Sequence, residues 1–337
     1  MIFFCHFLKF DFFPPSNKQS PSEQLKYYEE LKIEIFTYIF AEIYAISFLI
    51  TYLRVQLSMI SGVMYHENQI NTSSSSAMNN GNLLKDTTSR YYMFLSLLEN
   101  FHQKGIQHLV ETIRNMVKKS FENLKITDKV ALKDVLKNMR EVKDNFNESL
   151  ERLIEENVLI VYHCEHRFDE SMGNEQNVNK ILNEYKACSK FIDEMIDITK
   201  LSDFRVVMKN CIDIGYSNLF DIISECFIQF ERQNFQATNP KSIEQRQFIN
   251  PHHINVLLIK LLPLMWQQVQ NNDDDDNDNG NDDRMAGEFC EREKRNRNAL
   301  LVQYLLCSDS LTCFAANIYE AFCNEMSTRK TCSIATD

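Results

Sequence analysis

The chain is poor in the residues that interrupt helices. Its 337 residues include only 7 glycines and 6 prolines. Glycine and proline mark the turns of sheets and hairpins, so their scarcity favours long helices over a sheet-based fold. No G-x-x-x-x-G-K-[ST], G-x-G-x-x-G or G-x-S-x-G motif occurs. Nothing in the sequence therefore indicates a nucleotide-binding or hydrolase site, and we expect no enzyme and no cofactor.

Positive charge is also in short supply, with 36 Lys and Arg against 47 Asp and Glu and a net charge of -11. Proteins that bind nucleic acid concentrate Lys and Arg on one face, so this balance argues against nucleic acid as the main ligand. The ten cysteines, from Cys5 to Cys332, include no C-x-x-C pair. We expect free thiols in a reducing compartment that faces the cytosol.

Long uncharged runs are scarce as well. The first 13 residues are apolar but are interrupted by His6, Lys9 and Asp11, and they are too short to span a bilayer or to serve as a signal peptide. The run Ile43 to Leu53 has the length of a core helix, because a membrane span takes roughly 20 apolar residues. We predict a buried helix there.

Apolar residues at helical spacing are what the sequence has in abundance. Between Glu23 and Tyr65 they recur every three or four positions, and aromatic residues fill the positions between them. A helix that is apolar nearly all round must be surrounded by other helices. We predict an all-α fold, a large helical bundle around this one long and largely buried helix.

The same spacing predicts further helices from about Tyr91 to Phe121 with a break near Gly105, and from about 128 to 146, 175 to 195, 203 to 227, 254 to 269, 299 to 306 and 308 to 326. Pro263 should kink the helix at 254–269. We expect an irregular segment at 1–22 and one helical-bundle domain at 23–337. Polar or low-complexity composition predicts flexible loops at about 68–82, 236–250 and 271–284.

Two groups of histidines could suggest a metal site. His163, Cys164 and His166 lie close together, but no matching second pair supplies a fourth zinc ligand. His252 and His253 follow Pro251 at an expected helix start, where polar residues are common. We predict no metal, and keep as an alternative a metal-dependent helical enzyme that uses His163 and His166.

Three distant segments resemble the peroxin-3 family. YYEELKIEIF at 27–36, running into YLRVQLSMISG at 52–62, is similar to the family's long core helix. FRVVMKNCIDIGYSNLF at 204–220 and FAANIYEAF at 314–322 follow in family order, as does LLIKLLPL at 257–264. The similarity runs from about Pro15 to the C-terminus. It implies an all-helical receptor on the cytosolic face of the peroxisomal membrane, which binds the amphipathic N-terminal helix of peroxin-19 and promotes insertion of membrane proteins.

The resemblance also implies site residues. The family's docking groove uses an aromatic residue, normally Trp, three positions before a Leu, and the matching residues are Tyr28 and Leu31. Lys32 and Lys260 match basic partner contacts. Tyr in place of Trp buries less area and brings a hydroxyl that needs a partner. Tyr28 and Leu31 could alternatively be ordinary bundle core, since aromatic residues at helical spacing commonly pack inside.

Other matching positions imply structural roles. We expect Arg54 and Gln56 to form hydrogen bonds between helices, and Gly62 to permit close helix approach. The family's N-terminal basic stretch and membrane-spanning helix have no match in the sequence, so we expect either a truncated sequence or another route to the membrane. The rival interpretation is a helical scaffold that binds another protein's amphipathic helix without a membrane role.

Overall fold

The computed structural model describes residues 20–73, 91–92, 94–95, 97–98, 101–162, 189–238, 249–270 and 297–333. Helix accounts for most of them, and one long helix carries much of the buried surface, so the predicted all-α bundle around a largely buried helix is confirmed. The expected insert at 271–284, the segment 1–19 and the cluster of His163, Cys164 and His166 lie outside the described residues.

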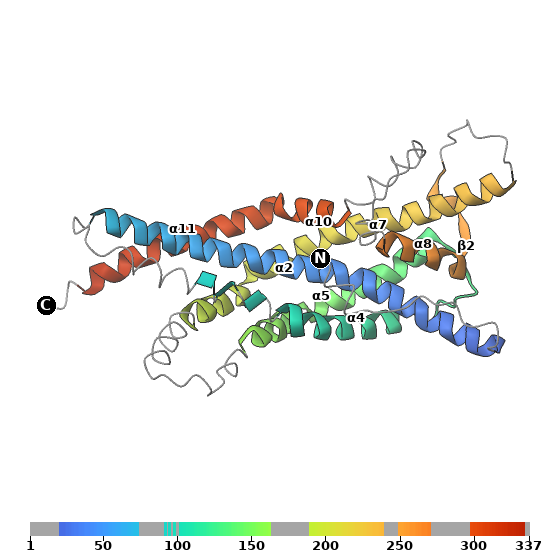
Figure 1. Cartoon of the computed structure of the whole chain (residues 1–337), viewed down its shortest axis with the longest axis horizontal. Coiled ribbons are helices and arrows are strands. Elements are labelled where there is room, and N and C mark those ends of the chain that lie inside the picture. Colours follow the sequence, from blue (N-terminus) through green and yellow to red (C-terminus); the bar gives the residue numbers. More distant parts are fainter. Residues whose placement is uncertain are drawn as a thin grey trace, which may run out of the picture. The chain divides into compact units, whose positions relative to one another are not determined.

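The elements follow one another along the chain as helices with one short ribbon (Figure 1). They are α2 (Pro21–Ser73), the π-helical turn η1 (Phe101–Gly105), α4 (Ile106–Phe121), β1 (Lys129–Ala131), α5 (Leu132–Tyr162), α7 (Ser202–Thr238), the 3₁₀ turn η3 (Pro251–His253), β2 (Asn255–Leu257), α8 (Leu258–Gln270), α10 (Arg297–Leu306) and α11 (Asp309–Ser333). Residues 189–200 are also helical.

The start of α2 is fixed by its own side chains. Ser20 Oγ accepts from the Glu23 N–H at 3.4 Å, and the Glu23 carboxylate accepts from the Ser20 N–H at 2.8 Å. This reciprocal capping box, with Pro21 at the first helical position, stabilises a helix start. The hydrogen bonds from Ser20 lower the pKa of Glu23. The helix therefore begins two residues before the predicted start at Glu23.

The chain forms two compact units, and the first comprises the described parts of Met1–Ala45, Gln107–Ser149 and Ile212–Gln303. Its core is aromatic: Tyr44 stacks on Phe146 with ring centroids 3.5 Å apart, and the Tyr44 and Tyr216 hydroxyls share a 2.8 Å hydrogen bond. Phe36 stacks on Phe121, which joins α2 to the end of α4. The first half of α2 is thus the central helix of this unit.

The second unit comprises the described parts of Ile46–Ile106, Leu150–Cys211 and Tyr304–Asp337. Here Tyr52 on α2 lies against the rings of Phe48, Phe101 and Phe204, at centroid distances of 5.8, 6.0 and 5.9 Å. Phe101 opens the π-helical turn, which ends at Gly105, where the sequence predicted a break. The expectation of a single domain over 23–337 stays a prediction.

Several local features differ from the expected elements. Residues 68–73 belong to α2, because Asn, Gln and Thr extend a helix that is already nucleated, although they do not favour one. A helix start was expected at 127–128, but residues 129–131 form β1, which pairs antiparallel with β2. The helix expected at 254–269 begins only at Leu258, because residues 255–257 form β2. Pro263 lies inside α8, as expected.

Among the described residues, α2 is the one single helix that is long and apolar enough to cross a membrane, with a mean hydropathy of 1.8 in its most apolar window. Of that window, 67% is buried inside the protein. The predicted buried helix at Ile43 to Leu53 lies in this part of α2, where Tyr44, Phe48 and Tyr52 are fully buried.

Candidate functional site

The structure places the four residues predicted to contact a partner in the first unit, with different exposures. Tyr28 is half-buried on the second turn of α2, and Lys260 is exposed on the first turn of α8. Leu31 is only 1% exposed and Lys32 only 3%. Tyr28 and Lys260 can therefore meet another molecule directly, whereas Leu31 lies in the core, as the alternative interpretation anticipated.

The Lys32 ammonium group is occupied by internal partners. Its Nζ donates to Glu29 Oε2 at 2.7 Å, to the Leu124 carbonyl at 2.5 Å and to the Phe121 carbonyl at 3.2 Å. An ammonium group has three N–H donors, and here each has an acceptor. Phe121 ends α4, so the positive charge also lies at the negative end of that helix dipole. In this arrangement Lys32 holds the loop after α4 against α2 and has no donor left for a partner.

Glu29 extends this connection to α8. Its second oxygen, Oε1, accepts from the Ile126 N–H at 2.8 Å, and the Ile126 carbonyl accepts from the Ile259 N–H at 3.0 Å. The Leu258 N–H donates to the Asp128 carbonyl, also at 3.0 Å. We call this hydrogen-bonded region, formed by Glu29, Lys32, residues 121–128 and residues 258–259, the α2–α8 junction. Glu29, which follows Tyr28, and Ile259, which precedes Lys260, are both hydrogen-bonded to Ile126 in the loop after α4.

Apolar surface lies beside the junction at the start of α2. Leu25, 46% exposed, precedes Tyr28 by three positions, so the two side chains share one helix face. Tyr27 meets Tyr28 edge to face, with ring centroids 5.6 Å apart. Partial burial and the neighbouring Tyr28 raise the pKa of Tyr27. Sequence reasoning missed Leu25, although its spacing from Tyr28 was the signal that could have identified it.

The three residues expected to have structural roles lie in the second unit. Gln56 is buried and its Nε2 donates to the Phe94 carbonyl at 2.8 Å. A Cβ on Gly62 would lie 2.7 Å from both the Tyr319 carbonyl oxygen and Phe322 Cβ, closer than real Cβ atoms come to other atoms. The backbone of α2 thus approaches α11 where only glycine fits. Arg54 is half-buried.

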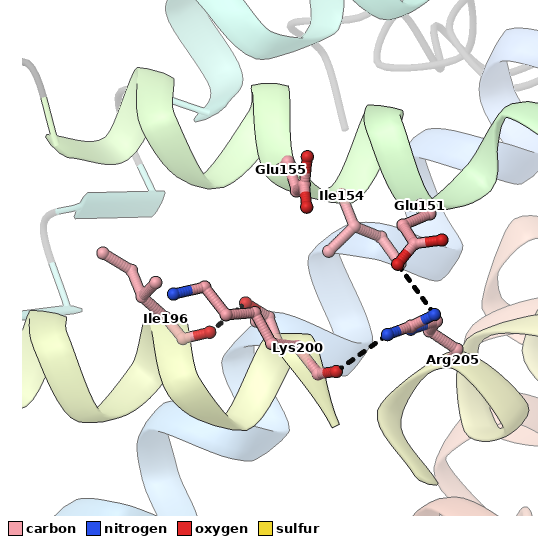
Figure 2. Close-up of a pocket in the computed structure, with 7 residues that line it drawn as sticks. Glu151, Ile154, Glu155, Ile196, Lys200 and Arg205 are labelled. Atoms are coloured by element: carbon pink, nitrogen blue, oxygen red, sulfur yellow. Dashed lines mark hydrogen bonds and ion pairs between the residues drawn. The ribbon is translucent and has the colours of Figure 1, made fainter. Parts of the chain in front are cut away.

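A cleft of about 220 Å³ lies in the second unit, away from all the predicted residues. Figure 2 shows Glu151 of α5 and Arg205 of α7 pointing toward each other across it, with N and O 2.8 Å apart. A second Arg205 nitrogen donates to the Lys200 carbonyl at 3.0 Å. The Arg205 guanidinium is therefore held by Glu151 and the Lys200 carbonyl, and these contacts indicate a structural role for it.

The described residues contain no group of three His, Cys, Asp or Glu that could hold a metal ion. His252 and His253 are exposed in η3, where the Asn250 side chain accepts from the His252 N–H. The residues of the α2–α8 junction include no nucleophile hydrogen-bonded to a base. What the region offers is apolar surface next to an exposed ammonium group, an arrangement that suits binding of another chain.

Comparison with known proteins gives the family. The peroxin-3 family model matches residues 14–321. Peroxisomal biogenesis factor 3 of Mus musculus is 22% identical over 306 residues, and that of Homo sapiens is 23% identical over 325 residues; each match covers 90% of this chain and 73% of the relative. Peroxisome biogenesis factor 3 of Dictyostelium discoideum is 23% identical over 242 residues, covering 67% of this chain and 55% of the relative. The chain belongs to the peroxin-3 family, whose members are peroxisomal biogenesis factors.

Proposed function

We propose that the chain is a docking receptor that binds the amphipathic N-terminal helix of peroxin-19 beside the α2–α8 junction, on the cytosolic face of the peroxisomal membrane. Family membership gives the broader role, which is peroxisome membrane biogenesis by a non-catalytic factor associated with that membrane. The finer proposal is that docking of the chaperone delivers membrane proteins for insertion. We propose no catalytic activity and no cofactor.

The observation that carries this proposal is the apolar surface at the start of α2, formed by the exposed Leu25 and the half-buried Tyr28. A partner helix that lies in a groove contributes a few apolar anchors at one face, and these anchors supply most of the binding energy. The exposed Lys260 on α8 adds a cation for an acidic or polar group of the partner helix. The hydrogen bonds of the junction tie both elements to one loop, so the two contacts are positioned before the partner arrives.

Leu31 and Lys32 support this surface from inside. Both are buried in the turn that follows Tyr28, and Lys32 anchors α2 to residues 121 and 124. A direct contact between Leu31 and the partner requires a side-chain movement, because only 1% of the residue is exposed. We therefore expect substitutions of Leu31 and Lys32 to lower folding stability as well as binding.

Calorimetry with the N-terminal peptide of peroxin-19 tests the proposal. Leu25→Ala and Tyr28→Ala should each weaken binding by about 2 kcal/mol, roughly thirtyfold, if the side chains are interface anchors. Leu57→Ala is the matched control, because Leu57 is a comparably exposed leucine, 41% exposed, farther along the same helix. Circular dichroism should show that all three variants keep their helix content.

An unchanged affinity in a folded Leu25→Ala/Tyr28→Ala double variant would overturn the assignment of this face. A pull-down that recovers other helical partners but no peroxin-19 would favour the rival interpretation, a helical scaffold without a membrane role.

A further inference from the structure

A group of lysines surrounds the loop between α4 and α5. Residues 118–137 contain six lysines and three acidic residues, in a chain whose net charge is -11. All six of these lysines are exposed, and so is Lys260. Within the described part of the chain, none of the seven takes part in an ion pair. We call these seven lysines (118, 119, 125, 129, 133, 137 and 260) the lysine surface.

The hydrogen bonds of the junction place most of these lysines near its edge. Lys118 and Lys119 occupy the last turn of α4, just before Phe121, whose carbonyl binds Lys32. Lys125 stands between Leu124 and Ile126, and both of these neighbours are bonded to residues of α2. Lys129 pairs in register with Leu257, three residues before Lys260. The lysine surface therefore adjoins the proposed docking face.

Two of the three acidic residues in the stretch are used by the backbone. The Asp128 carboxylate accepts from the Lys125 N–H at 2.8 Å, and the Asp134 carboxylate accepts from the Ala131 N–H at 3.0 Å. These carboxylates cap turns and leave the ammonium groups facing solvent. Lys118 and Lys119 also complement the dipole of α4, which is an ordinary structural role. That role does not account for Lys125, Lys129 or Lys260, which lie outside the last turn of any helix.

We propose that the lysine surface binds an acidic segment of the same polypeptide that docks its amphipathic helix on α2. This inference rests on the proposed function. A peptide chain that lies on Leu25 and Tyr28 can continue onto the lysines without leaving the molecule. Such charge complementarity mainly raises the association rate and makes binding sensitive to salt.

An anionic membrane fits the lysine surface less well. Segments that lie on a bilayer combine cations with large apolar side chains that enter the lipid. The large apolar residues that are exposed in the described chain, from Leu25 to Leu306, include none between 118 and 137. The net charge of -11 also repels an extended anionic surface.

The test compares two triple variants with the same change in charge. Lys119→Gln/Lys125→Gln/Lys129→Gln removes three cations from the lysine surface, and Lys190→Gln/Lys200→Gln/Lys209→Gln removes three exposed cations from the second unit. Association of full-length peroxin-19 is measured by stopped flow at about 50 mM and about 200 mM salt. At low salt the first variant should associate about tenfold more slowly than the wild type, and the difference should shrink at high salt. The control variant should behave like the wild type.

If the two variants have equal association rates and equal salt dependence, the proposed role of the lysine surface is wrong and the docking proposal is unaffected. If the wild type does not bind peroxin-19 at all, the docking proposal fails. Titration with a polyglutamate peptide then tests separately whether the lysine surface binds an acidic chain. Weaker polyglutamate binding in the first variant than in the control supports it, and equal binding overturns it. Sedimentation with phosphatidylcholine and phosphatidylserine vesicles that is lost only in the first variant would assign the surface to a membrane instead.

Discussion

At the scale of single residues, the core depends on a few polar groups that are buried with a partner. The hydroxyls of Tyr44 and Tyr216 are the clearest case, because both side chains are almost fully buried and the two groups share one hydrogen bond. Removing one of the two hydroxyls leaves the other buried without a hydrogen-bond partner. This usually lowers the free energy of unfolding more than removing both hydroxyls does.

Tyr216→Phe should therefore lower the free energy of unfolding by about 1 to 3 kcal/mol. The Tyr44→Phe/Tyr216→Phe double variant should lose less than the sum of the two single variants. Urea unfolding of the four proteins measures this cycle. Additive losses would show that the hydrogen bond contributes no coupling energy.

We also predict from this tyrosine pair that folding stability decreases at alkaline pH. Burial is the largest cause that raises the pKa of Tyr44 and of Tyr216 above the ordinary value of 10.0. Because the folded pKa values are raised, this contribution to stability is complete below the unfolded value and is lost as the pH rises above it. The difference in tyrosinate absorbance between the wild type and the Tyr44→Phe/Tyr216→Phe variant should show both hydroxyls titrating only with unfolding. A difference titration in the folded state near the ordinary value would contradict this.

At the scale of elements, the helices were predictable and the junction was not. In α2, apolar residues recur at helical spacing over many turns and helix-breaking residues are rare, so local sequence alone predicts the helix. Strands of three residues carry no usable period, so β1 and β2 gave no signal in the sequence. The environment of Lys32 depends on carbonyls 89 and 92 positions away. Contacts at that separation arise from the fold, which is why local sequence rules gave no sign of the internal acceptors of Lys32.

The backbone of α2 approaches α11 closely at Gly62, so we predict that a substitution at this position strongly lowers folding stability. Gly62→Ala should destabilise the protein by about 1 to 3 kcal/mol, because the added methyl meets the Tyr319 carbonyl and the backbone must shift. Gly215→Ala is an informative comparison, since its methyl would meet Cγ2 of the Ile43 side chain. The Gly215→Ala/Ile43→Ala double variant should lose less than the sum of the two single variants, because truncation of Ile43 makes room for the added methyl. Thermal unfolding measures all these variants, and a stable Gly62→Ala protein would show that the helices separate easily.

At the scale of the whole molecule, the two compact units share five of the described helices. The unit boundaries fall inside α2, α4, α5, α7 and α10, after Ala45, Ile106, Ser149, Cys211 and Gln303, respectively. Helix formation is cooperative along a chain, so we expect loss of structure in one unit to spread into the other through these helices.

The single tryptophan tests this coupling. Trp266 belongs to the first unit and Gly62 to the second, so Trp266 fluorescence reports on a unit that Gly62→Ala does not touch. We expect Gly62→Ala to lower the fluorescence midpoint as far as the circular dichroism midpoint, by about 2 °C for each kcal/mol lost. A fluorescence midpoint that stays at its wild-type value would mean two independent domains and would contradict the single domain predicted for 23–337.

The order of elements along the chain has a consequence for biosynthesis. With histidine neutral, Arg54 is the only formal charge between Glu42 and Glu67, so this part of α2 leaves the ribosome as a nearly uncharged apolar segment. The helix α7, which supplies Tyr216 and Phe204 to cover it, is completed more than 150 residues later. At ordinary translation rates that delay is roughly ten to thirty seconds. We therefore expect the nascent protein to need a chaperone of its own until α7 has been made.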